Sequence, residues 1–383
     1  MLSWNQILKI KLEEIVSKPK EIVLTGGPCA GKTTGLSHLQ SWLLDRGFRP
    51  LMIPEVATMI IGGGVQDIGK IASENFKLYL AIQKSMLKMQ LGLRKQFLNL
   101  AGNFTEQVVM VYDRGPMDGK AYIPHQYFDA ILAEEKLQLN EVRDVYDAVI
   151  HLVTAADGAE RYYTTANNQA RMETAEEARK LDLKTQDAWN GHPHMRVIDN
   201  STGFDLKIKR LISATARSLG IPVPLEIERK YLVSNFDFST IESQVQVVGI
   251  NQVYIHHPVD GMARIRKRHA TDGSATYYYT IKTASGSALV RYEREERISA
   301  TEYLNLESFR EPRRISIAKR RYCFIWHSQY FELDVFVSPA GLTLLEIELT
   351  EENDKVELPP FINVVREVTD DPQYSNYNLA KKI

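Results

Sequence analysis

Residues 26–33 have the types and spacing of a phosphate-binding loop. They read GGPCAGKT and satisfy the pattern GxxxxGK[ST], between an apolar strand-like segment and a helix-like one. Glycines let backbone N–H groups approach a phosphate, Lys32 can reach the terminal phosphates of a nucleotide, and Thr33 can ligate Mg²⁺. We therefore predict that ATP or GTP binds to Gly26, Gly27, Pro28, Cys29, Ala30, Gly31, Lys32, Thr33 and Thr34.

Three later residues are candidates to complete this nucleotide site. Asp113 and Arg114 directly follow an apolar segment, where an acid can position metal or water and a cation can neutralise phosphate. Asp113 is thus a metal-ligand candidate, with helix capping as the alternative, and Arg114 could instead form a surface ion pair. Glu55 ends another apolar segment and could accept a hydroxyl proton from a phosphoryl acceptor, but a plain turn acid explains it equally well.

A second group of charged residues begins at Glu226. In a strand, Glu226, Glu228 and Lys230 lie on one face, which suits a divalent cation beside a polyanion. Like-charged residues recur two apart on later strand-like segments, at Arg264 and Arg266, Lys319 and Arg321, Glu293 and Glu295, Glu332 and Asp334, and Glu346 and Glu348.

Such pairs would repel one another if they only decorated an open surface. Around a shared interior the basic residues, with Lys282, can bind phosphates while the acidic ones bind metal, and each set makes the other tolerable. By strand alternation, we expect Arg268, Arg294 and Arg320 to face solvent or to pair at strand ends.

The segments that position these residues show two different patterns of predicted secondary structure. From 20 to 220, apolar strand-like segments alternate with helical ones, which predicts an α/β domain with a five-stranded parallel sheet. Gly220, Pro222 and Pro224 end the last helix, so a second domain is expected at 224–383. Its strand-like segments and turn signals predict a mostly antiparallel sheet or closed barrel. Residues 1–19 are expected to form a separate amphipathic helix.

Composition excludes several classes of protein. A length of 383 residues favours two domains, and a net charge of -1 gives no global field that recruits nucleic acid or an anionic membrane. The two cysteines, Cys29 and Cys323, lack the spacing of a disulfide framework or a structural zinc site. Because no apolar run is long enough to span a bilayer, we expect a soluble cytoplasmic protein without a transmembrane segment.

The first half resembles a known P-loop family. The segments GGPCAGKTT, PEVAT, VYDRG and IDNS resemble the AAA-type family that includes the kinase domain of NadR-type proteins. This resemblance covers about residues 20–220 and implies a kinase-like fold that binds ATP or GTP, without identifying a phosphoryl acceptor.

The second half resembles the CYTH family of triphosphate tunnel metalloenzymes. The segments EIERKYLV, ARIRKR, YTIKT, RYEREERI, AKRRY, FELDVF and LLEIEL occur in that family's order. The resemblance implies an α+β domain with an eight-stranded antiparallel β-barrel that binds a triphosphate in its bore. It also implies that phosphates contact Lys230, Arg264, Arg266, Lys282, Lys319 and Arg321. Mg²⁺ or Mn²⁺ would be held by Glu226, Glu228, Glu346 and Glu348, with Glu293, Glu295 and Asp334 in support.

These features lead to one hypothesis and two alternatives. The hypothesis is a metal-dependent hydrolase of inorganic or nucleoside triphosphate that also binds ATP or GTP at its P-loop; it leaves open which carboxylate orients the water. The same pairing of domains is similar to eukaryotic translocation-defect proteins, which implies GTP-dependent binding of phosphatidic acid or another phosphorylated ligand without turnover. The other alternative is a kinase that acts on a nucleoside or small metabolite.

Overall fold

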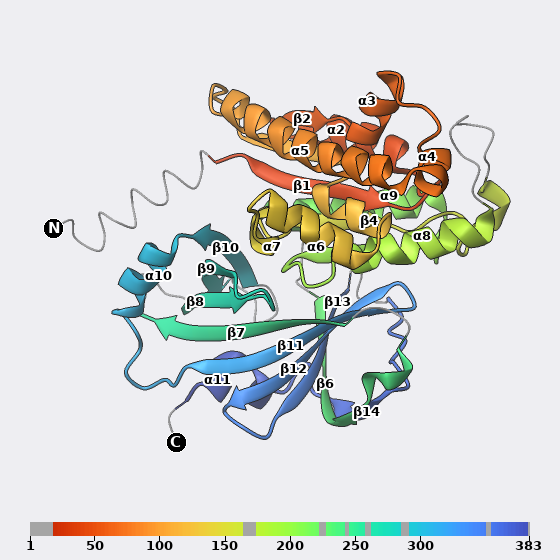
Figure 1. The fold of residues 1–383 in the computed structure, drawn as a ribbon. Coiled ribbons are helices and arrows are strands. Elements are labelled where there is room, and N and C mark those ends of the chain that lie inside the picture. The colour runs from red at the N-terminus through yellow and green to blue at the C-terminus, as the bar shows by residue number, and fades with distance from the viewer. Residues whose placement is uncertain are drawn as a thin grey trace. The chain divides into compact units, whose positions relative to one another are not determined.

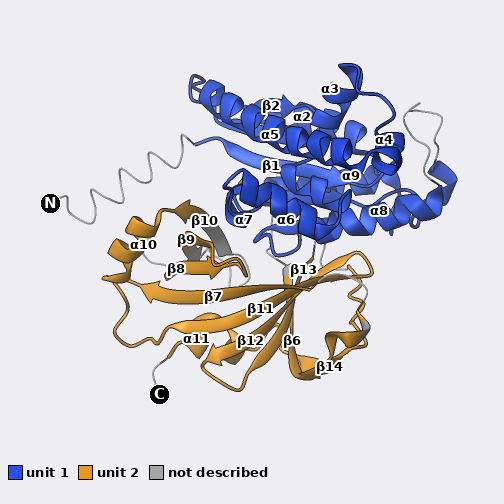
Figure 2. Cartoon of the chain, viewed as in Figure 1, with its two compact units in different colours: residues 1–218 blue, residues 219–383 orange. Residues whose placement is uncertain are grey.

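The computed structural model divides the chain into two compact units, Met1–Ser218 and Leu219–Ile383 (Figure 2). It describes residues 18–163, 174–221, 227–241, 245–256, 262–284, 291–349 and 354–381. The helix expected near the N-terminus lies outside these ranges except for its last residues. In the part of the chain that is described, no helix combines the length and apolar character that a membrane crossing requires.

The first unit contains a five-stranded parallel sheet, as the sequence predicts (Figure 1). Its strand order is β2-β3-β1-β4-β5, with β1 at Lys20–Gly26, β2 at Arg49–Ile53, β3 at Val108–Asp113, β4 at Ala148–Leu152 and β5 at Met195–Ile198. The central strands are apolar and almost continuously buried. This is typical of a parallel sheet covered on both faces.

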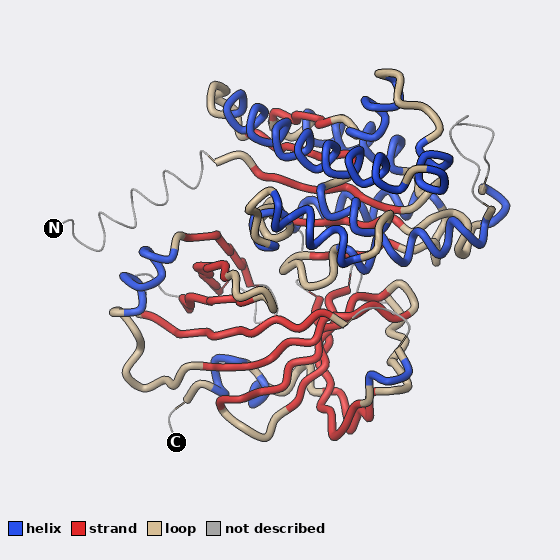
Figure 3. The backbone as a smooth tube through the Cα atoms, in the orientation of Figure 1, coloured by secondary structure: helices blue, strands red, loops and turns tan. Residues whose placement is uncertain are grey.

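Helices connect these strands and lie on both sides of the sheet (Figure 3). The α-helices are α2 at Lys32–Leu44, α3 at Val56–Gly62, α4 at Ile68–Glu74, α5 at Phe76–Ala101, α6 at His125–Glu134, α7 at Leu139–Val142, α8 at Ala175–Ala188 and α9 at Phe204–Ser218. Short 3₁₀ turns occur at Pro116–Ala121 and Glu160–Tyr162. Parallel strands need such crossover connections because no tight hairpin can join them.

The second unit is built on one nine-stranded antiparallel sheet. Its strand order is β10-β9-β8-β7-β11-β12-β13-β6-β14. The strands are β6 at Ile227–Phe236, β7 at Gln246–Ile255, β8 at Met262–His269, β9 at Ala275–Ala284, β10 at Arg291–Ile298, β11 at Ile317–Trp326, β12 at Gln329–Ser338, β13 at Thr343–Leu349 and β14 at Ile362–Glu367. Short helices complete it, η3 at Phe238–Thr240, α10 at Ala300–Glu307, η4 at Pro372–Tyr374 and α11 at Asn376–Leu379.

The expectation of a closed eight-stranded barrel is wrong on both counts. The sheet has nine strands, and within the described residues β10 and β14 form its two edges. The additional strand, β14, pairs with β6 through contacts such as Ile362 with Phe236. Closure would need β6 to pair with β10, but both edges of β6 are taken by β13 and β14.

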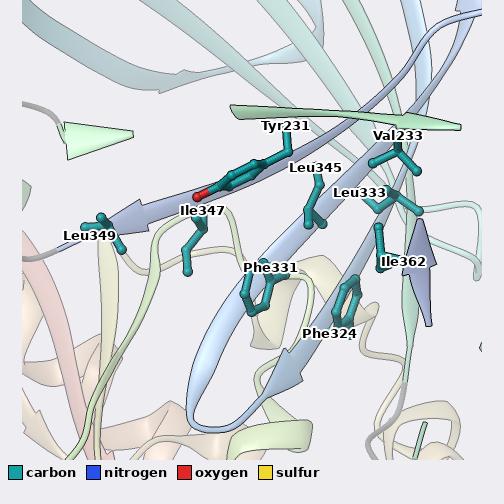
Figure 4. Close-up of a cluster of buried hydrophobic side chains, with 9 residues drawn as sticks. All are labelled: Tyr231, Val233, Phe324, Phe331, Leu333, Leu345, Ile347, Leu349 and Ile362. Atoms are coloured by element: carbon teal, nitrogen blue, oxygen red, sulfur yellow. The ribbon is translucent and has the colours of Figure 1, made fainter. Parts of the chain in front are cut away.

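Strand alternation separates an apolar face from a charged one. Phe331, Leu333 and Leu345 point into a buried apolar cluster, which Figure 4 shows with its other members Tyr231, Val233, Phe324, Ile347, Leu349 and Ile362. The intervening residues of β12 and β13 are acidic and point to the opposite face. Burial of the apolar cluster therefore fixes which face carries the charges.

Candidate functional site

The predicted phosphate-binding loop joins β1 to the N-terminus of α2. At this position the unsatisfied N–H groups and the dipole of α2 face an incoming anion. Gly26 and Gly31 have φ angles of 150° and 89°, which favour glycine. A Cβ atom on Gly26 would also lie 2.2 Å from the carbonyl oxygen of Leu152. Backbone geometry thus explains both glycines of the motif.

Lys32 is folded back onto this loop. Its Nζ donates hydrogen bonds to the carbonyl oxygens of Gly26 and Gly27, at 3.0 Å each. Burial lowers the pKa of Lys32 to about 8; the charge of Arg114 adds to this, and Asp113 oppositely raises it. Phosphate oxygens would be stronger partners for the ammonium than these neutral carbonyls.

Asp113 ends β3 and Arg114 follows it, both close to Lys32. Each has a buried polar atom without a hydrogen bond among the described residues. These atoms are Oδ1 of Asp113 and Nη1 of Arg114. Burial raises the pKa of Asp113 above its ordinary value, while Lys32 opposes the rise. An unsatisfied carboxylate oxygen can bind a cation. An unsatisfied guanidinium nitrogen can donate a hydrogen bond to a phosphate oxygen.

Glu55 is held by Arg114 and Thr58. Arg114 Nε donates to Glu55 Oε1 at 2.6 Å, and Thr58 Oγ1 donates to Oε2 at 2.6 Å. Burial raises the pKa of Glu55, but the charge of Arg114 and the hydrogen bond from Thr58 outweigh it, so that the pKa is below its ordinary value. A carboxylate with a lowered pKa is a weak proton acceptor, so this geometry favours a positioning role for Glu55.

Sequence reasoning missed Asp182, a buried residue of α8 that contacts the phosphate loop. Its Oδ1 accepts hydrogen bonds from the backbone N–H of Gly27 at 2.6 Å and of Thr154 at 3.2 Å. The same oxygen lies 3.1 Å from Nε2 of His151, and Oδ2 accepts from Gln186 at 2.8 Å. Burial raises its pKa, yet the contacts with His151 and the other donors outweigh this and lower it.

The only local signal for Asp182 is its helical spacing from buried Ala178 and Gln186. A carboxylate on the buried stripe of a helix needs several hydrogen bonds to be stable there. Apart from Gln186, its partners are His151 of β4, Thr154 just after β4 and Gly27 of the phosphate loop, which no sequence pattern placed near α8.

We expect Asp182→Asn to loosen the phosphate loop and destabilise the first unit by roughly 1–3 kcal/mol, because an amide cannot accept all four hydrogen bonds. The affinity for nucleotide should also fall, because the loop that binds the phosphates is less well held. Thermal melting and nucleotide titration measure both effects, with Glu176→Gln on the exposed face of α8 as control. Equal melting temperatures for the two variants would show that Asp182 does not hold the loop.

The second unit brings the basic pairs predicted from sequence onto one buried face. The side chains of Arg264 and Arg266 on β8 are 11% and 13% exposed, and those of Lys319 and Arg321 on β11 are 2% and 9% exposed. Arg320, between the last two, is exposed as expected. The side chains of these four cations therefore do not face bulk solvent.

Arg268 corrects one expectation. It is expected to face solvent or to pair at a strand end, but it is 1% exposed, so the solvent-facing alternative is wrong. It lies two residues after Arg266 and four after Arg264, so regular alternation puts all three side chains on the same face. Strand alternation therefore predicts an inward side chain at this position.

Arg321 is the centre of an ion-pair network on this face. It donates to Asp334 from Nε at 2.7 Å and from Nη2 at 2.6 Å, and Nη2 also contacts Glu346 at 2.9 Å. Nη1 contacts Glu332, and Lys319 contacts Asp334. These acids satisfy the buried cations when no anion is bound.

Lys230 extends the network onto β6. Its Nζ lies 3.0 Å from Glu228 Oε2 and 3.1 Å from Glu346 Oε1. Burial lowers the pKa of Lys230, but the two carboxylates outweigh this and raise it. Burial raises the pKa of Glu346, whereas Lys230, Lys319 and Arg321 together bring it well below its ordinary value. Both groups therefore stay ionised.

Two arginines of β8 share an acidic neighbour. Arg264 and Arg266 both face Glu295 of β10, at 3.9 Å and 3.4 Å. Glu295 Oε2 in turn accepts a hydrogen bond from Thr280 at 2.7 Å. Burial lowers the pKa of Arg266, and the charges of Arg264 and Arg321 add to this while Glu295 opposes it. Such crowding of cations favours a bound anion.

The candidate metal ligands are brought together in part. In the β6–β13 ladder Glu228 lies directly opposite Glu348, and Lys230 opposite Glu346. Two directly opposed carboxylates repel each other unless a cation lies between them, so this donor set suits a divalent ion. Among the described residues, however, no group of three or more His, Cys, Asp or Glu is arranged to hold a metal.

Three predicted residues cannot be compared in this way. Glu226 lies outside the described residues, as do the side chains of Lys282 and Glu293. The backbones of Lys282 and Glu293 are paired in the β9–β10 ladder, where the two residues lie opposite each other. These three assignments stay predictions.

Comparisons with known proteins match both halves of the chain. Residues 21–206 match a family model for an AAA domain. A stretch of 158 residues, 41% of this chain, is 34% identical to an inorganic triphosphatase of Acetivibrio thermocellus and covers 93% of that protein.

Two solved structures are also similar. The inorganic triphosphatase NE1496 is 31% identical, with 42% of this chain and 97% of that chain covered and a TM-score of 0.31. The PH1012 protein from Pyrococcus horikoshii OT3 is 17% identical, with 33% and 81% covered and a TM-score of 0.24.

Proposed function

The chain belongs to the inorganic triphosphatase family, and from this premise we propose that its second unit hydrolyses inorganic triphosphate with the help of a divalent cation. The first unit, which matches an AAA domain, is proposed to bind ATP or GTP at the loop around Lys32. Phosphoanhydride hydrolysis on the charged face would yield pyrophosphate and orthophosphate from one triphosphate and one water.

The observation that carries this proposal is the burial of Arg264, Arg266, Lys319 and Arg321 on one sheet face. Burying several like charges is costly unless opposite charges accompany them. The acids of β12 and β13 supply that charge now, and a triphosphate would add opposite charge beside Arg264 and Arg266 of β8, which lie 3.9 Å and 3.4 Å from Glu295. Guanidinium groups suit this role because their planar donors match phosphoryl oxygens.

Separate residues would bind the cation. Glu228, Glu346 and Glu348 provide carboxylates at one end of the charged face, and Glu346 stays ionised because its pKa is well below its ordinary range. A bound Mg²⁺ or Mn²⁺ would polarise a P–O bond of the substrate. Lys230 contacts both Glu228 and Glu346, so it can orient these ligands and neutralise charge beside the substrate.

In the first unit, Lys32 and Arg114 would contact phosphates and Thr33 and Asp113 would ligate the nucleotide's metal. These roles are supported by Oδ1 of Asp113 and Nη1 of Arg114, which are buried without a hydrogen bond among the described residues. Glu55 accepts a hydrogen bond from Arg114, so it is less available as the proton acceptor that a kinase would need. The kinase alternative therefore gains no support from this residue.

The test is product analysis on the full chain. With tripolyphosphate and Mg²⁺ or Mn²⁺, phosphorus NMR should show orthophosphate and pyrophosphate appearing in equal amounts, and EDTA should stop the reaction. No turnover with either ion would contradict the proposal, as would an unchanged rate in EDTA. Tight binding of a phosphorylated ligand without turnover would instead favour a regulatory binding protein.

A further inference from the structure

Arg114 has a backbone conformation that arginine rarely adopts. Its φ angle is 67°, in the left-handed region that normally favours glycine. Its N–H donates to the carbonyl oxygen of Leu24 on β1 at 3.0 Å, which fixes one side of the residue. Residues under this kind of strain persist only where surrounding contacts hold them, and they cluster at binding and active sites. The contacts that hold Arg114 are therefore candidates for a role in nucleotide binding.

Asp118 holds the chain directly after Arg114. Its Oδ2 accepts a hydrogen bond from the backbone N–H of Gly115 at 2.9 Å, and its own N–H donates to the Gly115 carbonyl oxygen at 3.0 Å. Asp118 is 3% exposed, so these bonds are made away from water. A Cβ atom on Gly115 would lie 2.5 Å from the ring of Trp189, so the turn packs closely against its neighbours. The strained residue is thus held on both sides.

The other carboxylate oxygen of Asp118 joins this turn to the strand that leads into the phosphate loop. Oδ1 accepts hydrogen bonds from the hydroxyl of Thr25 at 2.6 Å and from the indole N–H of Trp189 at 2.9 Å. Thr25 directly precedes Gly26, the first glycine of the loop. One buried carboxylate therefore bonds both to the turn that carries Arg114 and to the strand at the start of the phosphate loop.

The side chain of Arg114 is fixed as well. Its Nε donates to Glu55 Oε1 at 2.6 Å, and its Nη1 is buried without a hydrogen bond among the described residues. Glu55 thus orients the guanidinium, while Asp118 fixes the backbone from which it extends. The remaining donor is held in one place, as binding of a phosphate oxygen requires.

We propose that Asp118 is a positioning residue for Arg114, which sets the place of the guanidinium relative to the phosphate loop and so supports binding of the nucleotide's phosphates. This inference rests on the proposed binding of ATP or GTP by the first unit. A carboxylate that only stabilised the fold would not be coupled to Arg114 in nucleotide affinity.

The test begins with Asp118→Asn in the full chain. The amide keeps the size of the side chain, but its NH₂ group cannot accept the hydrogen bonds that a carboxylate oxygen accepts. Calorimetry with ATP and with GTP, each with Mg²⁺, should show Kd raised roughly tenfold to a hundredfold for the nucleotide that wild type binds. The control Asp129→Asn, at an exposed acid of α6, should stay within about twofold of wild type.

A double-mutant cycle separates positioning from a general structural role. Arg114→Gln alone should weaken binding by a factor similar to that of Asp118→Asn. Adding Asp118→Asn to Arg114→Gln should raise Kd by no more than about a further threefold, because the contact that Asp118 positions is already lost. Two factors that multiply in the double variant would overturn the proposal, as would wild-type Kd in folded Asp118→Asn.

A second variant decides the question if melting curves show that Asp118→Asn does not fold. Thr25→Val has nearly the same shape and removes only the donor to Oδ1, so Asp118 keeps its bonds to Gly115 and Trp189. We expect Kd to rise roughly threefold to tenfold in wild-type background and to stay unchanged in Arg114→Gln. An equal rise in both backgrounds would overturn the proposal. If wild type binds neither ATP nor GTP, the proposed nucleotide binding fails as well.

Discussion

Replacing Arg264 and Arg266 together by alanine is expected to reduce kcat/KM for tripolyphosphate by roughly a hundredfold to ten-thousandfold. Each residue would lose charge-assisted hydrogen bonds of roughly 1.5–3 kcal/mol, and the two losses combine on one ligand. Both side chains are buried and face Glu295, so the variant also leaves that carboxylate without its present cations. Steady-state release of orthophosphate measures the effect.

The matched control for this variant changes two cations that face away from the charged face. Lys267→Gln combined with Arg320→Gln removes the same formal charge from β8 and β11, and Arg320 is exposed. This double variant should keep kcat/KM within about threefold of wild type. Equal losses in the two double variants would mean that overall charge, and not the buried face, determines activity.

Lys32→Ala is expected to weaken nucleotide binding by roughly tenfold to a hundredfold or more, because the phosphates lose a charge-assisted contact in a buried site. The wild-type affinity should itself depend on pH. Burial lowers the pKa of Lys32 to about 8, so the ammonium is charged below this pH and loses its proton as the pH rises through it. Nucleotide affinity should therefore decrease above about pH 8 in wild type.

Two controls accompany the Lys32 prediction. Lys70→Ala, at an exposed lysine of the same unit, should bind nucleotide as wild type does. Tripolyphosphate hydrolysis by Lys32→Ala should be unchanged, because the proposed hydrolytic residues are all in the second unit. Unaltered nucleotide affinity in Lys32→Ala would contradict the assignment of the loop.

Local sequence patterns predicted the features that depend on short-range geometry. The phosphate loop was predictable because glycines at positive φ, a following helix and a preceding strand are all local requirements. The shared face of Arg264 and Arg266, and that of Lys319 and Arg321, was predictable because side chains two residues apart on a strand lie on the same face.

Features that depend on long-range pairing were not predictable in the same way. Strand β14 carries exposed and charged residues, and only its pairing with β6 identifies it as a strand. The contact of Asp182 with Gly27 joins residues 155 positions apart. Arg268 is different, because its inward position followed from alternation and was predicted incorrectly.

The pairing of Arg321 with Glu332, Asp334 and Glu346 explains how the charged face is stable before substrate binds. In the proposed function, a triphosphate would compete with these acids for Arg321 and with Glu295 for Arg264 and Arg266. No comparison supports phosphatidic acid as the anion.

A structure of the full chain crystallised with tripolyphosphate and Mn²⁺ tests the central claim most directly. The account predicts phosphate density in contact with Arg264, Arg266 and Arg321, and the anomalous signal of manganese beside Glu228, Glu346 and Glu348. Triphosphate bound only at the loop around Lys32, or arginines of β8 turned to solvent with no anion beside them, would contradict it.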